Sequence, residues 1–178
     1  MAPPRVLKTE TLYRGRALNL RLDEVEYAPG RSTRLEIVEH AEAVVVLPVD
    51  EAQNIWFVRQ YRHPAGRELL ELPAGILPAG ENPEDGARRE LREETGMTAG
   101  TLEHVLSFWT VPGYSTEYMY VFLATQLSPA PLAQDEDEVL TVEKVPLAQA
   151  LAMALDERLV CDGKTNLALL AAARRKGW

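Results

Sequence analysis

Apolar residues along the chain follow two textures, which divide the sequence into predicted elements. In the first part, charged segments alternate imperfectly between polar and apolar residues, a pattern typical of half-buried β-strands. Three such segments are expected, at 5–15, 16–28 and 32–40, with a Pro-Gly turn before the third. They contain too few large apolar residues to form a core, so we expect them to pack on the rest of the chain or on a second subunit.

From residue 42 onward the apolar residues are denser. Runs bounded by turn residues predict strands at 43–49, 54–62, 68–75, 102–110, 117–127 and 139–146. Helices are predicted at 83–95, 147–155 and 164–176, the first of them capped by Asn82 and ended by Gly96. Mostly antiparallel strands with helices on their faces indicate an α+β fold, with an N-terminal β region at 1–40 and a main domain at 41–178.

Aromatic and imidazole side chains in the strands suggest no site of their own. Trp56 is assigned to the core. Trp109 either borders a site or, as is more common for an aromatic residue in an apolar strand, lies in the core. His40, His63 and His104 are scattered without the spacing of metal ligands, so none is assigned to a metal.

The composition limits the classes of binding partner that we expect. With 19 basic and 27 acidic residues the net charge is −8, which argues against nucleic acid as the main partner but allows a phosphate substrate, because a metal held by carboxylates reverses the local field. No apolar run approaches the ~20 residues of a membrane span, and the N-terminus is too polar for a secretory signal. The single cysteine, Cys161, fits a reducing compartment, so a cytoplasmic location is expected.

The predicted helix at 83–95 carries an unusual concentration of carboxylates. Glu90, Glu93 and Glu94 project from nearly the same side, because residues three and four apart share a helix face. Like charges so spaced destabilise a helix by a few tenths of a kcal/mol per pair, so helix propensity does not explain them. One interpretation is a solvated face neutralised by interleaved arginines. The other is a divalent cation site, because Mg²⁺ prefers oxygen ligands.

A motif favours the second interpretation. Its fixed positions are filled by Gly75, Glu81, Arg89, Glu90, Leu91, Glu93, Glu94, Gly96 and Met97. This is the Nudix box, G-x5-E-x7-R-E-U-x-E-E-x-G-U with U aliphatic, and agreement at every fixed position is highly specific. The chain therefore resembles the Nudix hydrolases, which bind Mg²⁺ or Mn²⁺ and hydrolyse a nucleoside diphosphate linked to another moiety. The resemblance implies an α/β/α sandwich on a mixed sheet.

The resemblance also implies roles for the box. The expected metal ligands are the carboxylates of Glu90, Glu94 and Glu93 and the carbonyl of Ala74. Arg89 is expected to orient the glutamates by ion pairing. Glu81 is expected to anchor the preceding loop and to reach the metals through water.

Outside the box the chain is similar to the ADP-ribose pyrophosphatases of this family through nearly its whole length. The stretch 57–75 matches their approach to the box, 111–117 their Ser-Pro-Gly loop with its following glutamate, and 134–138 their acidic catalytic loop. Val111 departs from the pattern, because it replaces the usual serine. Two N-terminal segments resemble the domain through which these enzymes exchange strands, so a homodimer is expected.

This similarity suggests the remaining site residues. Glu136 is expected to be the general base, with Glu138 as the alternative or as a further metal ligand. An ordinary exposed acidic loop would have the same sequence, and in some family members the box glutamates are thought to activate the water. Substrate contacts are expected from Arg62, Arg67, Glu117, Arg14 and Arg16, with Tyr13 beside the last two.

These contacts have separate rationales. Arg62 and Arg67 suit a phosphate or the terminal ribose, although a surface ion pair with Glu68 or Glu71 would look the same in sequence. Glu117 suits ribose hydroxyls. The N-terminal arginines are expected to meet the adenine or ribose across the dimer interface.

The leading hypothesis is hydrolysis of ADP-ribose to AMP and ribose 5-phosphate. The box itself does not separate this from the same chemistry on a nucleotide-sugar, a dinucleotide coenzyme or a dinucleoside polyphosphate. A sensor that binds nucleotide without cleaving it is disfavoured, because every box glutamate is present.

Overall fold

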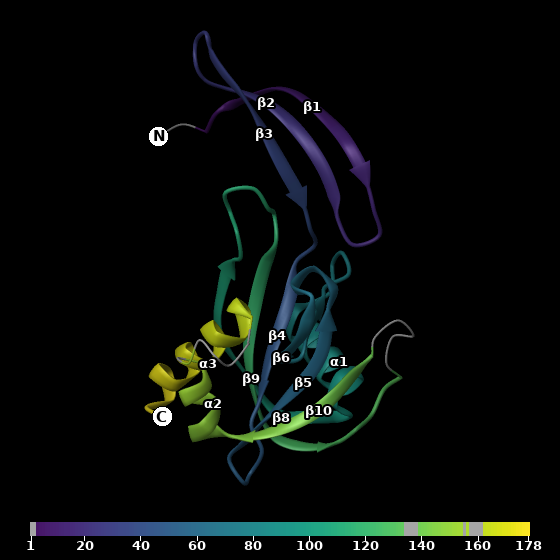
Figure 1. Ribbon diagram of the computed structural model, residues 1–178, viewed down its shortest axis with the longest axis vertical. Helices are drawn as coiled ribbons and strands as arrows, with labels where there is room; N and C mark the ends of the chain where they lie inside the picture. Colours follow the sequence, from purple (N-terminus) through teal and green to yellow (C-terminus); the bar gives the residue numbers. More distant parts are fainter. Residues whose placement is uncertain (1–2, 134–138, 155, 157–161) are drawn as a thin grey trace. The chain divides into compact units, whose positions relative to one another are not determined.

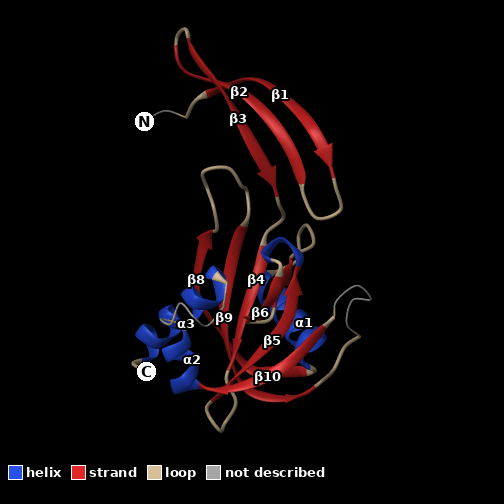
Figure 2. Cartoon of the chain, viewed as in Figure 1, coloured by secondary structure: helices blue, strands red, loops and turns tan. Residues whose placement is uncertain are grey.

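The computed structural model describes residues 3–133, 139–154, 156 and 162–178 (Figures 1 and 2). Its strands are β1 (Arg5–Arg14), β2 (Asn19–Ala28), β3 (Arg31–Glu39), β4 (Ala43–Pro48), β5 (Asn54–Arg62), β6 (Arg67–Glu71), β7 (Ala74–Ile76), β8 (Met97–Trp109), β9 (Tyr118–Pro129) and β10 (Leu140–Pro146). Its helices are the short 3₁₀ helix η1 (His63–Ala65) and α1 (Pro83–Thr95), α2 (Leu147–Met153) and α3 (Gly163–Lys176).

The chain forms two compact units. One consists of Met1–Glu42 with Trp109–Tyr118, and the other of Ala43–Phe108 with Met119–Trp178. None of the helices in the described residues has the length and apolar content that a bilayer crossing requires.

The first unit is an antiparallel sheet in the order β1-β2-β3. The segment before β9 joins it through the backbone of Val38, which donates to Tyr114 O at 2.8 Å and accepts from Thr116 N at 3.0 Å. Val25 is buried, but most large apolar side chains of these strands are exposed, namely Val6, Leu7, Leu12, Tyr13 and Tyr27. The sheet therefore has little apolar core, as its sparse apolar content predicts.

The second unit contains a mixed sheet in the order β7-β4-β9-β8 and a second sheet in the order β10-β5-β6. In the mixed sheet, β4 runs parallel to β9 and antiparallel to β7. The predicted α+β class and mixed sheet therefore agree with the structure. The first strand of the unit, β4, is buried along its whole length.

Both faces of β4 are covered, because its alternate residues enter different cores. Val45 and Leu47 pack with residues of β5, β6, α2 and α3. Val44 and Val46 pack with Ala87 and Leu91 of α1 and with Phe122 of β9. Burial on both faces explains why the sequence shows a continuous apolar run there rather than alternation. It also fixes α1 against one face of the mixed sheet.

The strand predicted at 68–75 is two strands in different sheets. The chain bends at Leu72 and Pro73, so β6 pairs with β5 and β7 pairs with β4. Pro73 has no N–H to donate, and its carbonyl accepts from Val46 N at 2.8 Å. Leu72 N donates to the buried Thr165 hydroxyl at 2.9 Å rather than to a strand. The sequence does not reveal this bend, because its hydroxyl partner lies 93 residues away.

Other expectations were also wrong. β8 begins at Met97, five residues before its predicted start, and Gly100 within it packs so closely on Gln126 that a Cβ there would lie 2.6 Å from the glutamine Oε1. Trp56 is only partly buried, with Nε1 donating to Asp50 at 3.0 Å and Lys144 Nζ 3.8 Å from its ring centroid. For Trp109 only the core alternative is wrong, because its side chain is 53% exposed and meets Tyr118 edge to face. Each indole has a polar or aromatic partner outside the apolar core.

Candidate active site

Helix α1 begins and ends as its sequence predicts. Asn82 Oδ1 accepts from Glu84 N at 2.9 Å, and Pro83 occupies the first turn. At the other end Gly96 adopts φ 72°, and its N–H donates to Arg92 O. A left-handed residue at this position favours glycine. The helix therefore has a fixed length and register.

The register of α1 places two of the box carboxylates inside the protein. Glu90 and Glu94, one turn apart, are 7% and 4% exposed. Ala74 N, on β7, donates to Glu94 Oε2 at 3.2 Å. A Cβ on Gly75 would lie 2.0–2.3 Å from the carboxylate atoms of Glu90. Glycine is therefore required at 75, because only a bare backbone leaves room for that carboxylate.

Arg89 holds the neighbouring carboxylates in place. Its guanidinium binds Glu81 through two bonds of 3.0 and 2.8 Å, and it binds Glu90 at 2.5 Å and Glu93 at 2.9 Å. A further bond of 3.1 Å reaches the carbonyl of Ile76. The bond to Glu81 is the main cause that raises the pKa of Arg89, and the same bond lowers the pKa of Glu81. The ion pairs expected of Arg89 are therefore present.

The donor set suits a hard divalent cation. Glu90 and Glu94 supply oxygen ligands from adjacent turns, with Glu93 on the same side of the helix. In the described part of the chain no three His, Cys, Asp or Glu side chains already converge as a metal group. Mg²⁺ needs only one or two carboxylates when water and substrate phosphates complete its coordination, so the two buried glutamates fit it.

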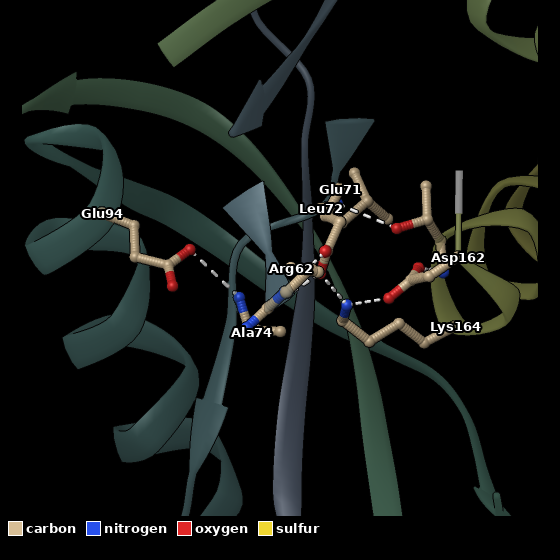
Figure 3. Close-up of polar contacts among 8 residues, drawn as sticks. Arg62, Glu71, Leu72, Ala74, Glu94, Asp162 and Lys164 are labelled. Atoms are coloured by element: carbon tan, nitrogen blue, oxygen red, sulfur yellow. Dashed lines mark hydrogen bonds and ion pairs between the residues drawn. The ribbon is translucent and has the colours of Figure 1, made fainter. Parts of the chain in front are cut away.

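A second charged cluster lies on the other side of β7 from α1 (Figure 3). Arg62 binds the buried Glu71 through Nε–Oε1 and Nη2–Oε2 bonds of 2.7 and 2.8 Å. Lys164, in the first turn of α3, contacts both Glu71 and Asp162. Burial alone would raise the pKa of Glu71, but the bonds from Arg62 and the charge of Lys164 outweigh it and lower the pKa to about 2.

The structure shows which glutamate pairs with Arg62. Its partner is Glu71 rather than Glu68, and because Glu71 is 1% exposed this is no surface ion pair. Arg67 lies opposite Arg62 in the β5–β6 register and is exposed.

Three of the other predicted residues belong to the first unit. Glu117 belongs to the first unit, 3.4 Å from His40 Nδ1. Arg14 and Arg16 are exposed in the same unit, at and just after the end of β1. Glu136 and Glu138 lie outside the described residues.

The sequence analysis missed Asp162, Lys164 and Thr165, and it treated Glu71 only as a surface partner. Two signals were available. Glu71 stands between two leucines that are both buried, which is unusual for a charged residue. Lys164 places a cation at a helix N-terminus, where the dipole disfavours it unless carboxylates compensate.

Residues 39–162 match the sequence model of the NUDIX domain. The chain belongs to the Nudix family. The family predicted from the box is therefore confirmed, and Nudix hydrolases generally use divalent metal ions.

Two relatives and one solved structure are similar to nearly the whole chain. An ADP-ribose pyrophosphatase of Bacillus subtilis (strain 168) is 40% identical over 167 residues, covering 93% of this chain and 90% of the relative. A methanol dehydrogenase activator of Bacillus methanolicus is 37% identical with the same coverage. A crystal structure of an ADP compounds hydrolase superposes with a TM-score of 0.88 at 26% identity, covering 99% of this chain and 96% of that one. This Nudix hydrolase is thus similar in sequence to the first two proteins and in fold to the third.

Substituting Gly75→Ala is expected to leave the Nudix hydrolase folded but to lower its hydrolysis rate by about 100-fold or more, because Glu90 must move by roughly an ångström. The rate is measured on whichever nucleoside diphosphate derivative the wild type cleaves. Gly163→Ala is the control, since a Cβ there meets nothing within 4 Å. Similar rates in the two variants would contradict the role of the bare backbone.

Because the pKa of Glu71 is lowered, the free energy of unfolding of this hydrolase is expected to fall at acidic pH. Its pKa is lowered from 4.5 to about 2, so the unfolded chain binds more protons between these values. Its contribution, a few kcal/mol, is present above about pH 4.5 and is lost as the pH falls toward 2. Urea unfolding at a series of pH values should therefore show a shallower loss in Glu71→Gln than in the wild type. If the free energy of unfolding fell equally with pH in both proteins, the predicted contribution of Glu71 would be wrong.

Proposed function

We propose that this enzyme hydrolyses ADP-ribose to AMP and ribose 5-phosphate. The observation that carries the proposal is a complete Nudix box, folded as a buried pair of carboxylates, in a chain 40% identical to an ADP-ribose pyrophosphatase over 93% of its length. The broader title of the structural match, an ADP compounds hydrolase, supports a second candidate, the same chemistry on other ADP derivatives.

The reaction adds one water to the diphosphate. A water oxygen forms a bond to one phosphorus, the bond from that phosphorus to the bridging oxygen breaks, and the bridging oxygen leaves with the other phosphate. When bound, Mg²⁺ or Mn²⁺ would neutralise charge on the phosphoryl oxygens and favour loss of a proton from water.

The residues of the chain divide this work. Glu90 and Glu94, with Glu93 and the carbonyl of Ala74, would hold the cation. Arg89 keeps the carboxylates together through the bonds described above. Glu136 is proposed as the base that takes the water proton, with Glu138 as the alternative.

Substrate recognition is proposed to involve Arg62, Arg67 and Glu117, with Arg14 and Arg16 contributed at a homodimer interface. The exposed apolar residues of the β1-β2-β3 sheet support a second subunit, because a sheet so poorly covered is rarely stable alone.

A substrate panel tests the proposal. With Mg²⁺ present, ADP-ribose is expected to be cleaved with a higher kcat/KM than nucleotide-sugars, dinucleotide coenzymes or dinucleoside polyphosphates, and the products are identified by chromatography. A much higher kcat/KM for one of the other classes would replace ADP-ribose by that class.

The metal site is tested by Glu94→Gln. The amide keeps the shape of the side chain but removes the charge that binds a cation, so kcat is expected to fall by several orders of magnitude in a folded protein. Glu84→Gln, in the exposed first turn of the same helix, is the matched control. Calorimetry with Mn²⁺ should show weaker binding only in Glu94→Gln. Near wild-type turnover there would remove Glu94 from the metal site.

A further inference from the structure

We propose that Glu71 is a positioning residue that holds Arg62 ready for the substrate diphosphate, and that Lys164 of α3 secures it from behind. The proposal rests on the proposed function, because it assigns Arg62 to the diphosphate. Its basis is an alternating line of charges, Arg62, Glu71, Lys164 and Asp162, that connects β5 and β6 to the start of α3 (Figure 3).

Both carboxylate oxygens of Glu71 accept hydrogen bonds from its two cationic neighbours. Its side chain is 2% exposed, Oε1 accepts from Arg62 Nε, and Oε2 accepts from both Arg62 Nη2 and Lys164 Nζ. Lys164 is in turn 10% exposed and held by Asp162. A buried carboxylate whose two oxygens accept three bonds from cations is held in one orientation, so it fixes the plane of the Arg62 guanidinium.

The pairing with Glu71 leaves some N–H donors of Arg62 unused. The two bonds to Glu71 use one edge of the guanidinium, two of its five N–H groups. The side chain is 42% exposed, and the other three N–H groups are not used by Glu71. The hydrogen bonds to Glu71 are the main cause that raises the pKa of Arg62, and the charge of Glu94 adds to it. Fixing an arginine beforehand reduces the freedom it loses on binding an anion.

The same segment is anchored toward the metal site. Leu72 N donates to Thr165, the carbonyl of Pro73 accepts from Val46, and Ala74 N donates to Glu94. Asp162 makes two contacts at the start of α3. Its Oδ1 caps the helix by accepting from Thr165 N, and its Oδ2 accepts from Lys164 Nζ. The start of α3 therefore fixes the bend that leads from Arg62 and Glu71 to Ala74.

A stabilising role alone would not require this arrangement. Buried ion pairs are often no more stabilising than apolar residues of the same volume. Arg59, also on β5, binds Glu143 of β10 through bonds of 3.0 and 2.7 Å to one carboxylate oxygen, but Glu143 is 44% exposed. This second pair provides a matched control.

The test is a double-variant cycle on KM. Glu71→Gln is expected to raise KM for ADP-ribose about 10-fold, the loss of one charge-assisted hydrogen bond, with a much smaller change in kcat. Arg62→Lys keeps the charge but loses the fork, and it should raise KM similarly. In the double variant the two effects should not multiply, because both act through one guanidinium. Glu143→Gln should leave KM unchanged.

Lys164→Gln keeps the Arg62–Glu71 pair, so it is expected to raise KM by less than Glu71→Gln. If Glu71→Gln does not fold, judged by circular dichroism, Lys164→Gln replaces it in the cycle. An unchanged KM in the Glu71 variant, or effects that multiply to about 100-fold in the double variant, would overturn the proposal.

Failure of the proposed function is distinguishable from failure of this inference. If the wild type cleaves another diphosphate, the function is replaced and the cycle is measured on that substrate. If it cleaves none of the panel, the cycle is measured as the dissociation constant of ADP-ribose by calorimetry. Equal constants for wild type and Glu71→Gln would then overturn the positioning role.

Discussion

The contact on which the site depends is the one between the carboxylates of α1 and the backbone of β7. Two acidic side chains are kept out of bulk water there, which is costly unless a partner repays it. Ala74 donates to one, and Gly75 leaves space for the other, while Arg89 gathers Glu81, Glu90 and Glu93. Like charges that would destabilise an isolated helix are thus tolerated, because the surrounding fold supplies a backbone donor and a cation.

That contact exists because β4 is buried on both faces. Its even-numbered valines pack on α1 and its odd-numbered residues pack toward α2 and α3. The same strand pairs with β7, so one apolar element sets both the carboxylates and the backbone they meet. Hydrophobic packing is non-directional, but alternation along a strand makes it directional here, since a shift of one residue would exchange the two faces.

The sequence predicts those features whose determining residues are close together in the chain, and it fails where a determining residue is far away in the chain. Helix α1 was predicted with its observed bounds, because its cap, its proline and its terminal glycine are local signals. The box residues were found because their spacing is local too. The bend at Leu72 was missed, since its partner Thr165 lies 93 residues away in the chain. The Glu71 cluster was missed for the same reason: the leucines on either side of Glu71 are a local signal that it is buried, but its lysine partner lies 93 residues away on the last helix.

The two arginine clusters differ in the work that their geometry suits. Arg89 makes bonds to three carboxylates and a carbonyl, so nearly all its donors serve the protein itself, and its function is to shape the acidic face. Arg62 makes bonds to one carboxylate along one edge, which leaves three of its N–H groups unused by that carboxylate. A fully engaged arginine organises ligands, whereas an arginine held along one edge presents a fork of fixed orientation. An acidic enzyme needs both arrangements to bind a diphosphate. Its carboxylates must be held together for a cation, and at least one positive group must be held where its own carboxylates do not neutralise it fully.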